Sequence, residues 1–385
     1  MRRRDLALLL ALTACGAGAT QVASTTPVAP SATTTTTPTD TTTATPSATP
    51  VSTPAPPPPP PDSTATAPLP PPKPATIHLG DGELAAGDDA FEKGDLVAAQ
   101  KHYAAAPAGV PRTVGLARVR IARVDVPLDY ASAKGNAEVT AAAGDLSRAA
   151  KTAPPFGPAF VELGRARLLL GDAPGALDAL RKGTQILPEE AEAHSQLGIA
   201  LLATGHAADA VRELQRAVDL DAGSPARHGN LGTALMMTGR TKEAIAEYET
   251  RARIDDGDAR AHSDLGTALL GTQDLERALA ELQRAVALDP SRATFHSNLG
   301  YALQQTGRLD RAVAEYHEAL RLDPKLVSAW INLATALSRD PKTRPQARAA
   351  LERARQLAPD DPRVKANLEE LDAVEKGVDQ PQRSP

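Results

Sequence analysis

The feature that most constrains the fold of this 385-residue chain is a repeat with a period of 34 residues. Four related strings, HSQLG, HGNLG, HSDLG and HSNLG, begin at His194, His228, His262 and His296. The period runs from about residue 157 to residue 360, and each unit contains two helical patterns of about a dozen residues. A repeat of this length predicts a solenoid, in which each unit packs mainly against its neighbours.

Glycine and proline mark the ends of the helices in each unit. Gly205, Gly239 and Gly307 lie between the two helical patterns, where the residue after a helix end often adopts a left-handed conformation. Asp-Pro pairs at 289–290 and 323–324 end the second helix and start the next unit. Aromatic residues make up only 3% of the chain, while alanine and leucine are abundant, which suits closely packed helices. Each unit is therefore predicted to be a helix–turn–helix.

The spacing of large and small residues resembles that of the tetratricopeptide repeat (TPR). The unit from residue 293 carries the pattern at His296, Leu299, Gly300, Leu303, Ala312, Tyr316, Ala319 and Pro324. The resemblance covers six repeats over residues 157–360. It implies an all-α fold, a right-handed TPR superhelix (α-solenoid) of about six to eight helix pairs. Small residues at repeat positions 8, 20 and 27 would let neighbouring helices approach closely.

The flanks of the array carry weaker versions of the same pattern. Residues 80–155 predict degenerate TPR-like helices, with one pair over 87–107 and another over 112–153 that has a longer turn around 126–129. Residues 361–377 resemble a lone capping helix, which closes the last apolar face of a solenoid. Residues 378–385 are expected to be a disordered tail.

The N-terminus predicts a targeting signal. Arginines at positions 2–4 precede the short apolar run LALLLAL, and the string LTAC ends at Cys15. The run is too short to span a bilayer and predicts a signal peptide over residues 1–14. LTAC resembles the bacterial lipobox, which implies lipidation of Cys15; an ordinary secretory signal with an incidental cysteine is the alternative. By the same resemblance, Gly16 in place of an aspartate favours the outer membrane of a Gram-negative envelope.

Residues 15–76 predict a disordered linker. They are almost wholly Thr, Pro, Ala and Ser, as in TTTTT and PPPPPP. So little of this segment can be buried that ordering its backbone would not be compensated. We expect a stalk between a lipid anchor and the repeats.

The four histidines all fall at repeat position 4, where the chain elsewhere has Phe160 and Trp330. A metal site needs ligands about 2 Å from a common centre. Adjacent helix axes lie about 8–10 Å apart, so equivalent residues of successive units are too far apart to share an ion. We therefore expect the rings to pack between the two helices of each unit and predict no metal site. Burial disfavours a charged imidazole, so the sequence predicts neutral rings and a loss of stability in acid.

A second polar series stands at repeat position 6: Glu162, Gln196, Asn230, Asp264, Asn298 and Asn332. The NLG strings resemble the TPR array of O-GlcNAc transferases, in which an asparagine ladder on the concave face holds extended peptides. A carboxamide offers both a donor and an acceptor, so it can pair with a peptide unit whatever its side chain. The resemblance predicts peptide binding by Gln196, Asn230, Asp264, Asn298 and Asn332, although Gln196 and Asp264 depart from the pattern. The alternative is that these residues are solvated or capped locally.

The residues disfavour several function classes. The chain has no Gly-rich phosphate loop and no GxSxG, HExxH or CxxC motif, so we predict that it is not an enzyme and holds no cofactor. The resemblance to O-GlcNAc transferases stops at the repeats. The net charge is −5 without a dense basic stripe, which disfavours nucleic acid as a partner.

The sequence therefore predicts a lipid-anchored cell-envelope TPR scaffold or adaptor. It would bind an extended peptide or protein partner in its concave groove and serve the assembly or localisation of an envelope complex. The alternatives are a structural spacer and a non-catalytic subunit of an envelope enzyme complex. The oligomeric state is not indicated.

Overall fold

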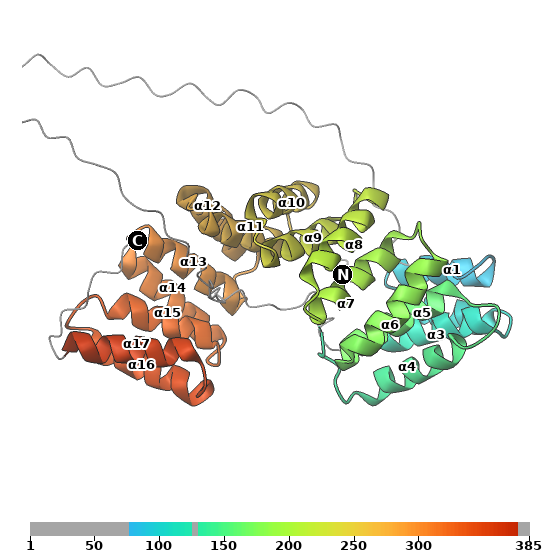
Figure 1. The fold of residues 1–385 in the computed structure, drawn as a ribbon, viewed down its shortest axis with the longest axis horizontal. Helices are drawn as coiled ribbons and strands as arrows, with labels where there is room; N and C mark the ends of the chain where they lie inside the picture. The colour runs from blue at the N-terminus through green and yellow to red at the C-terminus, as the bar shows by residue number, and fades with distance from the viewer. Residues whose placement is uncertain (1–76, 125–129, 376–385) are drawn as a thin grey trace, which may run out of the picture. The chain divides into compact units, whose positions relative to one another are not determined.

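The computed structural model describes residues 77–124 and 130–375, and within them the chain forms 17 α-helices and no strand (Figure 1). The all-α fold class is confirmed. The predicted signal peptide, Cys15, the linker, the turn at 126–129 and the C-terminal tail lie outside the described residues. None of the helices in the described ranges combines the length and apolar character that crossing a membrane requires.

The helices form eight consecutive pairs followed by a single helix. The first helices of the pairs are α1 (Glu83–Glu92), α3 (Val110–Ala122), α5 (Gly157–Leu170), α7 (Ala191–Ala203), α9 (Pro225–Met237), α11 (Ala259–Gly271), α13 (Ala293–Gln305) and α15 (Val327–Leu337). The second helices are α2 (Leu96–Ala105), α4 (Ala137–Ala149), α6 (Ala173–Ile186), α8 (Ala207–Leu220), α10 (Thr241–Ile254), α12 (Leu275–Leu288), α14 (Leu309–Leu322) and α16 (Arg344–Leu357). The last helix is α17 (Pro362–Glu375).

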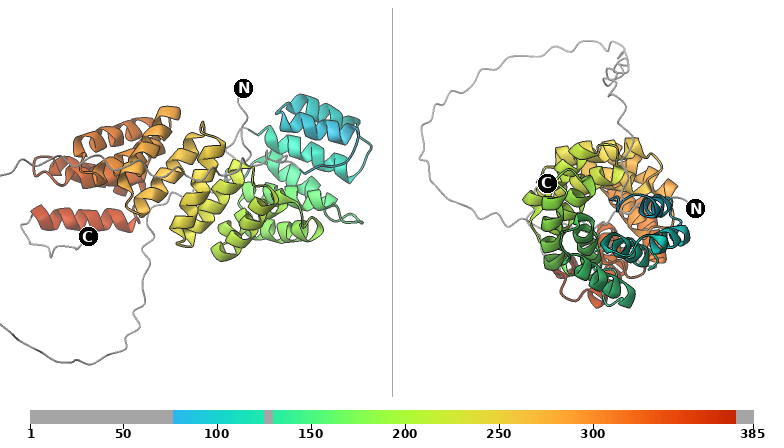
Figure 2. Two further views of the ribbon diagram at one scale, coloured as in Figure 1. Left: turned by 90° about the horizontal axis from the view of Figure 1, so that it is seen from above. Right: turned by 90° about the vertical axis from the view of Figure 1, so that its right-hand side faces the viewer.

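The pairs follow one another in sequence order, as Figure 2 shows. Each second helix contacts both its own first helix and the first helix of the next pair. First helices of neighbouring pairs also contact each other, as α5 with α7 and α13 with α15 do, whereas second helices in the described residues make no comparable contact. Since the first helices lie closer together than the second, the stack curves with the first helices on its inner side.

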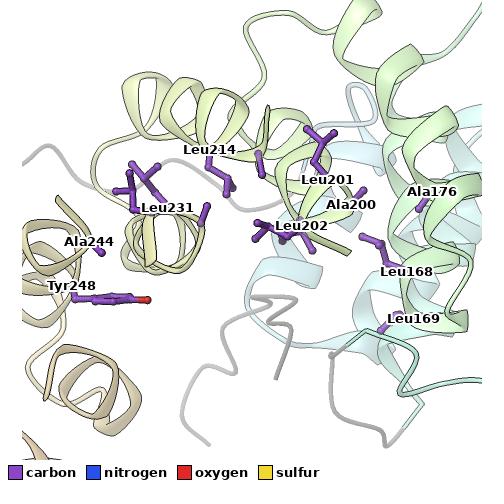
Figure 3. Close-up of a cluster of buried hydrophobic side chains, with 14 of the residues drawn as sticks. Leu168, Leu169, Ala176, Ala200, Leu201, Leu202, Leu214, Leu231, Ala244 and Tyr248 are labelled. Atoms are coloured by element: carbon purple, nitrogen blue, oxygen red, sulfur yellow. The ribbon is translucent and has the colours of Figure 1, made fainter. Parts of the chain in front are cut away.

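A large hydrophobic core runs continuously through the pairs, and a small second cluster of Ile331, Ala354 and Val364 lies toward the C-terminal end of the array. The large core includes residues from Ile77 near the start of the described chain to Leu371 in α17. Figure 3 shows its middle part, with Leu214 of α8, Leu231 of α9 and Tyr248 of α10 among the buried side chains. This continuity is typical of a solenoid, because each pair buries its apolar faces against its neighbours.

Glycine at repeat position 8 permits the close approach of the two helices in a pair. A Cβ added at Gly164, Gly198 or Gly232 would lie 2.3–2.6 Å from the leucine or tyrosine at repeat position 24. Gly266 and Gly300 have the same environment. The predicted role of small residues at this position is confirmed.

The capping helix is also confirmed. In α17 only Val364 and Leu371 are buried, and they pack toward α15 and α16. Most other side chains of α17 are polar and reach solvent at least in part. The helix therefore covers the last apolar face of the array and presents a polar surface beyond it.

The turns between the helices of a pair use left-handed backbone. Gly205, Gly239 and Gly307 have φ of 80°, 75° and 75°, as predicted, but the corresponding residue between α11 and α12 is Gln273, with φ of 62°. A side chain in this region costs about 1 kcal/mol or more, because its Cβ crowds the following carbonyl.

We expect Gln273→Gly to raise the free energy of unfolding by up to about 1 kcal/mol, reduced by the greater freedom of glycine in the unfolded chain. The reverse change at an equivalent turn, Gly307→Gln, should lower stability. Thermal melting followed by circular dichroism measures both. Equal melting temperatures for the two variants would contradict this account of the turn.

Candidate peptide-binding face

All six residues at repeat position 6 lie on first helices, from α5 to α15. Position 9 follows one helical turn later on the same side of each helix. We call the surface that carries positions 6 and 9 of these helices the inner face, because first helices occupy the inner side of the stack. The six residues differ widely in their surroundings along this face.

The N-terminal residue of the series is part of a buried ion network. Glu162 is 3% exposed and accepts from Arg118 Nε of α3 at 2.8 Å, while Arg165 Nη1 lies 3.3 Å from its other oxygen. Although burial alone would raise the pKa of the Glu162 carboxyl, Arg165 and Arg118 hold it below its usual value. Both carboxylate oxygens of Glu162 are therefore occupied by ion pairs within the protein.

The next two residues are buried as well. Gln196 is 2% exposed and donates to Glu192 Oε1 at 2.8 Å. Asn230 is 4% exposed, and its amide lies 3.4 Å from Ser195 Oγ on the preceding first helix. Neither side chain offers a peptide more than a small part of its surface.

Asp264 is accessible but already paired. Its carboxylate accepts from Arg251 Nη1 of α10 at 2.8 Å, and Arg260 Nε lies at 3.8 Å. Its side chain is 28% exposed. This position therefore presents an ion pair to solvent instead of a free carboxamide.

Asn298 and Asn332 are partly exposed and carry the amide chemistry that the sequence predicts. Asn298 Nδ2 makes two long hydrogen bonds, of 3.3 Å to Ser263 Oγ and 3.4 Å to Thr267 Oγ1. Within the described residues Asn332 makes no side-chain hydrogen bond, so its amide is left to solvent or to a ligand. Bonds beyond about 3.2 Å are weak, so a peptide could replace those of Asn298.

Two exposed apolar side chains lie on first helices as well. Tyr301 is 39% exposed and stands at position 9 of α13, one turn after Asn298. Met237, at the end of α9, is 43% exposed. The other large exposed apolar residues in the described ranges, Val97, Ile186 and Val374, are dispersed over α2, α6 and α17. The C-terminal half of the inner face thus combines two partly exposed amides with an aromatic ring.

A hollow of ≈ 590 Å³ lies elsewhere, between α3 and α4. Its lining includes Leu116, Arg120, Asn136 and Glu138, and none of the residues at position 6. It contributes nothing to the predicted site.

The four histidines at repeat position 4 have the same surroundings in every repeat, and the sequence predicted these surroundings only in part. Each ring lies between the two helices of its own pair, so the packing role is confirmed. Nδ1 lies 2.6–2.7 Å from a glutamate on the second helix, and Nε2 lies 3.0–3.1 Å from the backbone carbonyl six residues earlier. The pairs are His194–Glu213, His228–Glu247, His262–Glu281 and His296–Glu315.

The pKa of His194 shifts in the direction opposite to the one that burial alone predicts. The hydrogen bond to Glu213 raises the pKa of this imidazole, and the bond to the Pro188 carbonyl adds to the effect, against the lowering caused by burial. Desolvation alone favours a neutral ring, but the carboxylate of Glu213 outweighs it. The four glutamates were missed although each stands 19 residues after its histidine, a regular spacing that could have revealed them.

Metal-ligating side chains do not gather in the described residues. No group of three or more His, Cys, Asp or Glu side chains comes together there in a way that could hold an ion. Each of the four imidazoles has its own glutamate and its own carbonyl as neighbours.

Two tetratricopeptide repeat family profiles match the chain, one over residues 201–269 and the other over residues 263–327. The chain therefore contains TPR repeats, the class of repeat that generally mediates binding between proteins. No curated protein sequence matches the chain.

Several solved structures are similar to this chain. The Cut9–Hcn1 hetero-tetramer of the APC/C aligns with a TM-score of 0.58 and 15% identity, over 75% of this chain and 55% of that one. The pilF protein of Pseudomonas aeruginosa has a TM-score of 0.48 and 18% identity, over 56% and 97% of the two chains. YrrB, described as a TPR protein with an unusual peptide-binding site, has a TM-score of 0.40 and 22% identity, over 50% and 99%. The likeness to Cut9–Hcn1 shows the fold alone.

Proposed function

We propose that this protein is a lipid-anchored scaffold or adaptor of a bacterial cell envelope, and that its inner face binds an extended segment of a protein partner. The LTAC string with Cys15 supports the anchor, and the Thr/Pro-rich residues after it support a stalk. The partner would be held for the assembly or localisation of an envelope complex. No catalytic role is included.

The observation that carries the proposal is the partly exposed amide pair on neighbouring first helices, Asn298 of α13 and Asn332 of α15. The two residues are 34 positions apart and stand at the same place in adjacent repeats. Packed helices lie about 10 Å apart and an extended strand rises about 3.3 Å per residue, so the two amides can pair with peptide units about three residues apart on one strand. Tyr301 beside them supplies an apolar surface for a side chain of that strand. The proposal thereby concentrates binding on the C-terminal repeats, because Gln196 and Asn230 are buried.

The proposal is tested by selecting random peptides from a display library on the full chain and measuring the dissociation constant of the best binder. Replacing both asparagines, with Asn298→Ala and Asn332→Ala together, should weaken binding by about 30- to 150-fold, at about 1–1.5 kcal/mol for each lost hydrogen-bonded contact. The matched control is Asn230→Ala, which deletes the same amide group from a buried residue at repeat position 6. It should leave the dissociation constant unchanged.

Two outcomes would contradict the proposal. One is equal affinity for the parent and the double variant, with melting temperatures also equal. The other is that no extended peptide is selected at all. Either result would favour the alternative of a structural spacer that makes lateral contacts through its second helices.

A further inference from the structure

The His–Glu pairs of α7 to α14 repeat one arrangement of atoms four times. In each pair an imidazole has an acceptor on both sides, a carboxylate oxygen at Nδ1 and a main-chain carbonyl at Nε2. His228, His262 and His296 are only 5–7% exposed, so water has little access to replace either partner. Both hydrogen bonds must be made within the protein or lost.

The number of protons follows from this geometry. A neutral imidazole has one N–H group and can satisfy only one of the two acceptors. Satisfying both requires one further proton, on the ring or shared with the carboxylate. Each His–Glu pair with both bonds intact therefore holds one proton more than a neutral ring beside an ionised glutamate.

The sixth repeat makes the same hydrogen bond to the carbonyl with a different ring. In the sixth repeat Trp330 stands at position 4, and its Nε1 donates to the Pro324 carbonyl at 3.0 Å. That carbonyl is also six residues earlier, and an indole nitrogen can only donate. The equivalent Nε2 of each histidine therefore takes the place of a donor, which leaves Nδ1 to face its glutamate.

Repeat position 23 varies together with position 4. Where position 4 is histidine, position 23 is glutamate in all four repeats. Where position 4 is Phe160, position 23 is the buried Ala179. Where position 4 is Trp330, it is the buried Ala350, once the one residue inserted near 341–345 is counted. In the first helix pair the two residues are exchanged, since Glu83 lies on α1 and His102 on α2, with Nδ1 and Oε2 2.8 Å apart. Histidine and glutamate therefore occur together at positions 4 and 23, and the glutamates do not simply reflect the many acidic residues on the helix surfaces.

We propose that the four His–Glu pairs act as a pH-sensitive brace, which takes up one proton each and stabilises the middle four repeats of the array in acid. The brace joins the two helices of a pair through the glutamate. It joins consecutive helix pairs through the backbone carbonyl in the loop before each first helix. Loss of the proton removes one of these hydrogen bonds in every repeat and loosens residues 191–322 relative to their flanks. The inference is independent of the proposed peptide binding.

Other charges near the rings modify the effect without removing it. Arg216 opposes the charged form of His194, while Asp256 Oδ1 lies 3.5 Å from His262 Nε2 and favours it. Glu318 interacts electrostatically with His296. Because Glu213 raises the pKa of His194 above the value in an unfolded chain, about 6.5, its contribution is complete below that pH and is lost as the pH rises through the folded value.

The test compares the full chain with a variant that has glutamine at all four glutamates: Glu213, Glu247, Glu281 and Glu315. Glutamine keeps the shape and can donate to Nδ1, so both bonds survive with a neutral ring. The parent's melting temperature should fall by roughly 5 °C or more between about pH 6 and about pH 9, and the variant should lose about half or more of this dependence. A charge-matched control has glutamine at four exposed glutamates, Glu138, Glu276, Glu369 and Glu370, and should melt with the parent's pH dependence.

A second measurement does not depend on the variant's folding. Nitrogen-15 NMR of the parent at about pH 7 should find both ring nitrogens protonated in the four position-4 histidines. Equal pH dependence in the parent and the four-glutamine variant, or one unprotonated nitrogen in each of the four rings below about pH 6.5, would overturn the proposal.

Discussion

Arg118→Met should destabilise the N-terminal helix pairs by about 3–5 kcal/mol, as expected when one partner is removed from a buried ion network. Arg118 of α3 is 1% exposed and reaches Asp88 Oδ1 at 2.9 Å, Glu162 Oε1 at 2.8 Å and the Ile77 carbonyl at 3.0 Å. Burial alone would lower the pKa of this guanidinium, but Glu162, Tyr103 and Asp88 together raise it. Methionine preserves much of the volume and leaves two buried carboxylates without this cation.

The effect should be local, because repeats in a solenoid interact mainly with their neighbours. Hydrogen exchange should show lost protection in α1 and α3, while α11 to α16 keep theirs. The control is Arg216→Met, whose exposed pair with Glu189 should contribute less than about 1 kcal/mol. Adding Asp88→Asn and Glu162→Gln to Arg118→Met should recover part of the loss. Unchanged protection of α1 in the single variant would show that the network does not hold this end together.

Gly300→Ala should lower the free energy of unfolding by about 1–3 kcal/mol, the usual cost of overpacking. The added Cβ would lie 2.7 Å from Tyr316 Cε1 and 3.2 Å from the Ala312 carbonyl oxygen. Tyr316 is fully buried, and its hydroxyl donates to Gln304, so the ring has little room to move. The pair α13 and α14 would have to separate.

The same substitution in open space provides the control for Gly300. Gly144 lies within α4, where an added Cβ would meet nothing closer than Arg148 Nη1 at 3.8 Å. Gly144→Ala should stabilise the protein by about 0.5–1 kcal/mol, since alanine is the better helix former. Opposite shifts of the two melting temperatures are expected. Shifts of the same sign would mean that the contact between Gly300 and Tyr316 does not limit the helix packing.

The helix pairs could be predicted from the sequence because the fold of a repeat depends on short-range spacing. Gly300 and Tyr316 are 16 residues apart, and the same pair of positions recurs in the neighbouring repeats. Such periodic residues report the contact between two adjacent helices directly. The degenerate pairs before residue 157 and the capping helix followed from the same pattern with fewer matches.

The properties of the inner face could not be predicted in the same way. Asn230 and Asn332 share a repeat position, but Asn230 is 4% exposed and lies against Ser195, whereas Asn332 is partly exposed. Their exposure depends on side chains of the preceding repeat, which a periodic pattern does not specify. Arg118 was missed for a related reason, because its partner Glu162 is 44 residues away and the helix between them belongs to a degenerate pair. Lipidation of Cys15 stays a prediction.

The binding of a partner along the inner face is tested most directly by photo-crosslinking. A benzophenone amino acid would replace Tyr301 in the full chain, and in a second version Val97, which is 74% exposed on the second helix α2. Each version would be mixed with envelope proteins, and the mixture would then be illuminated. We predict an adduct through position 301 that Asn298→Ala with Asn332→Ala abolishes, and none through position 97. An adduct formed only through position 97, or one at position 301 that survives loss of both asparagines, would contradict peptide binding by this face.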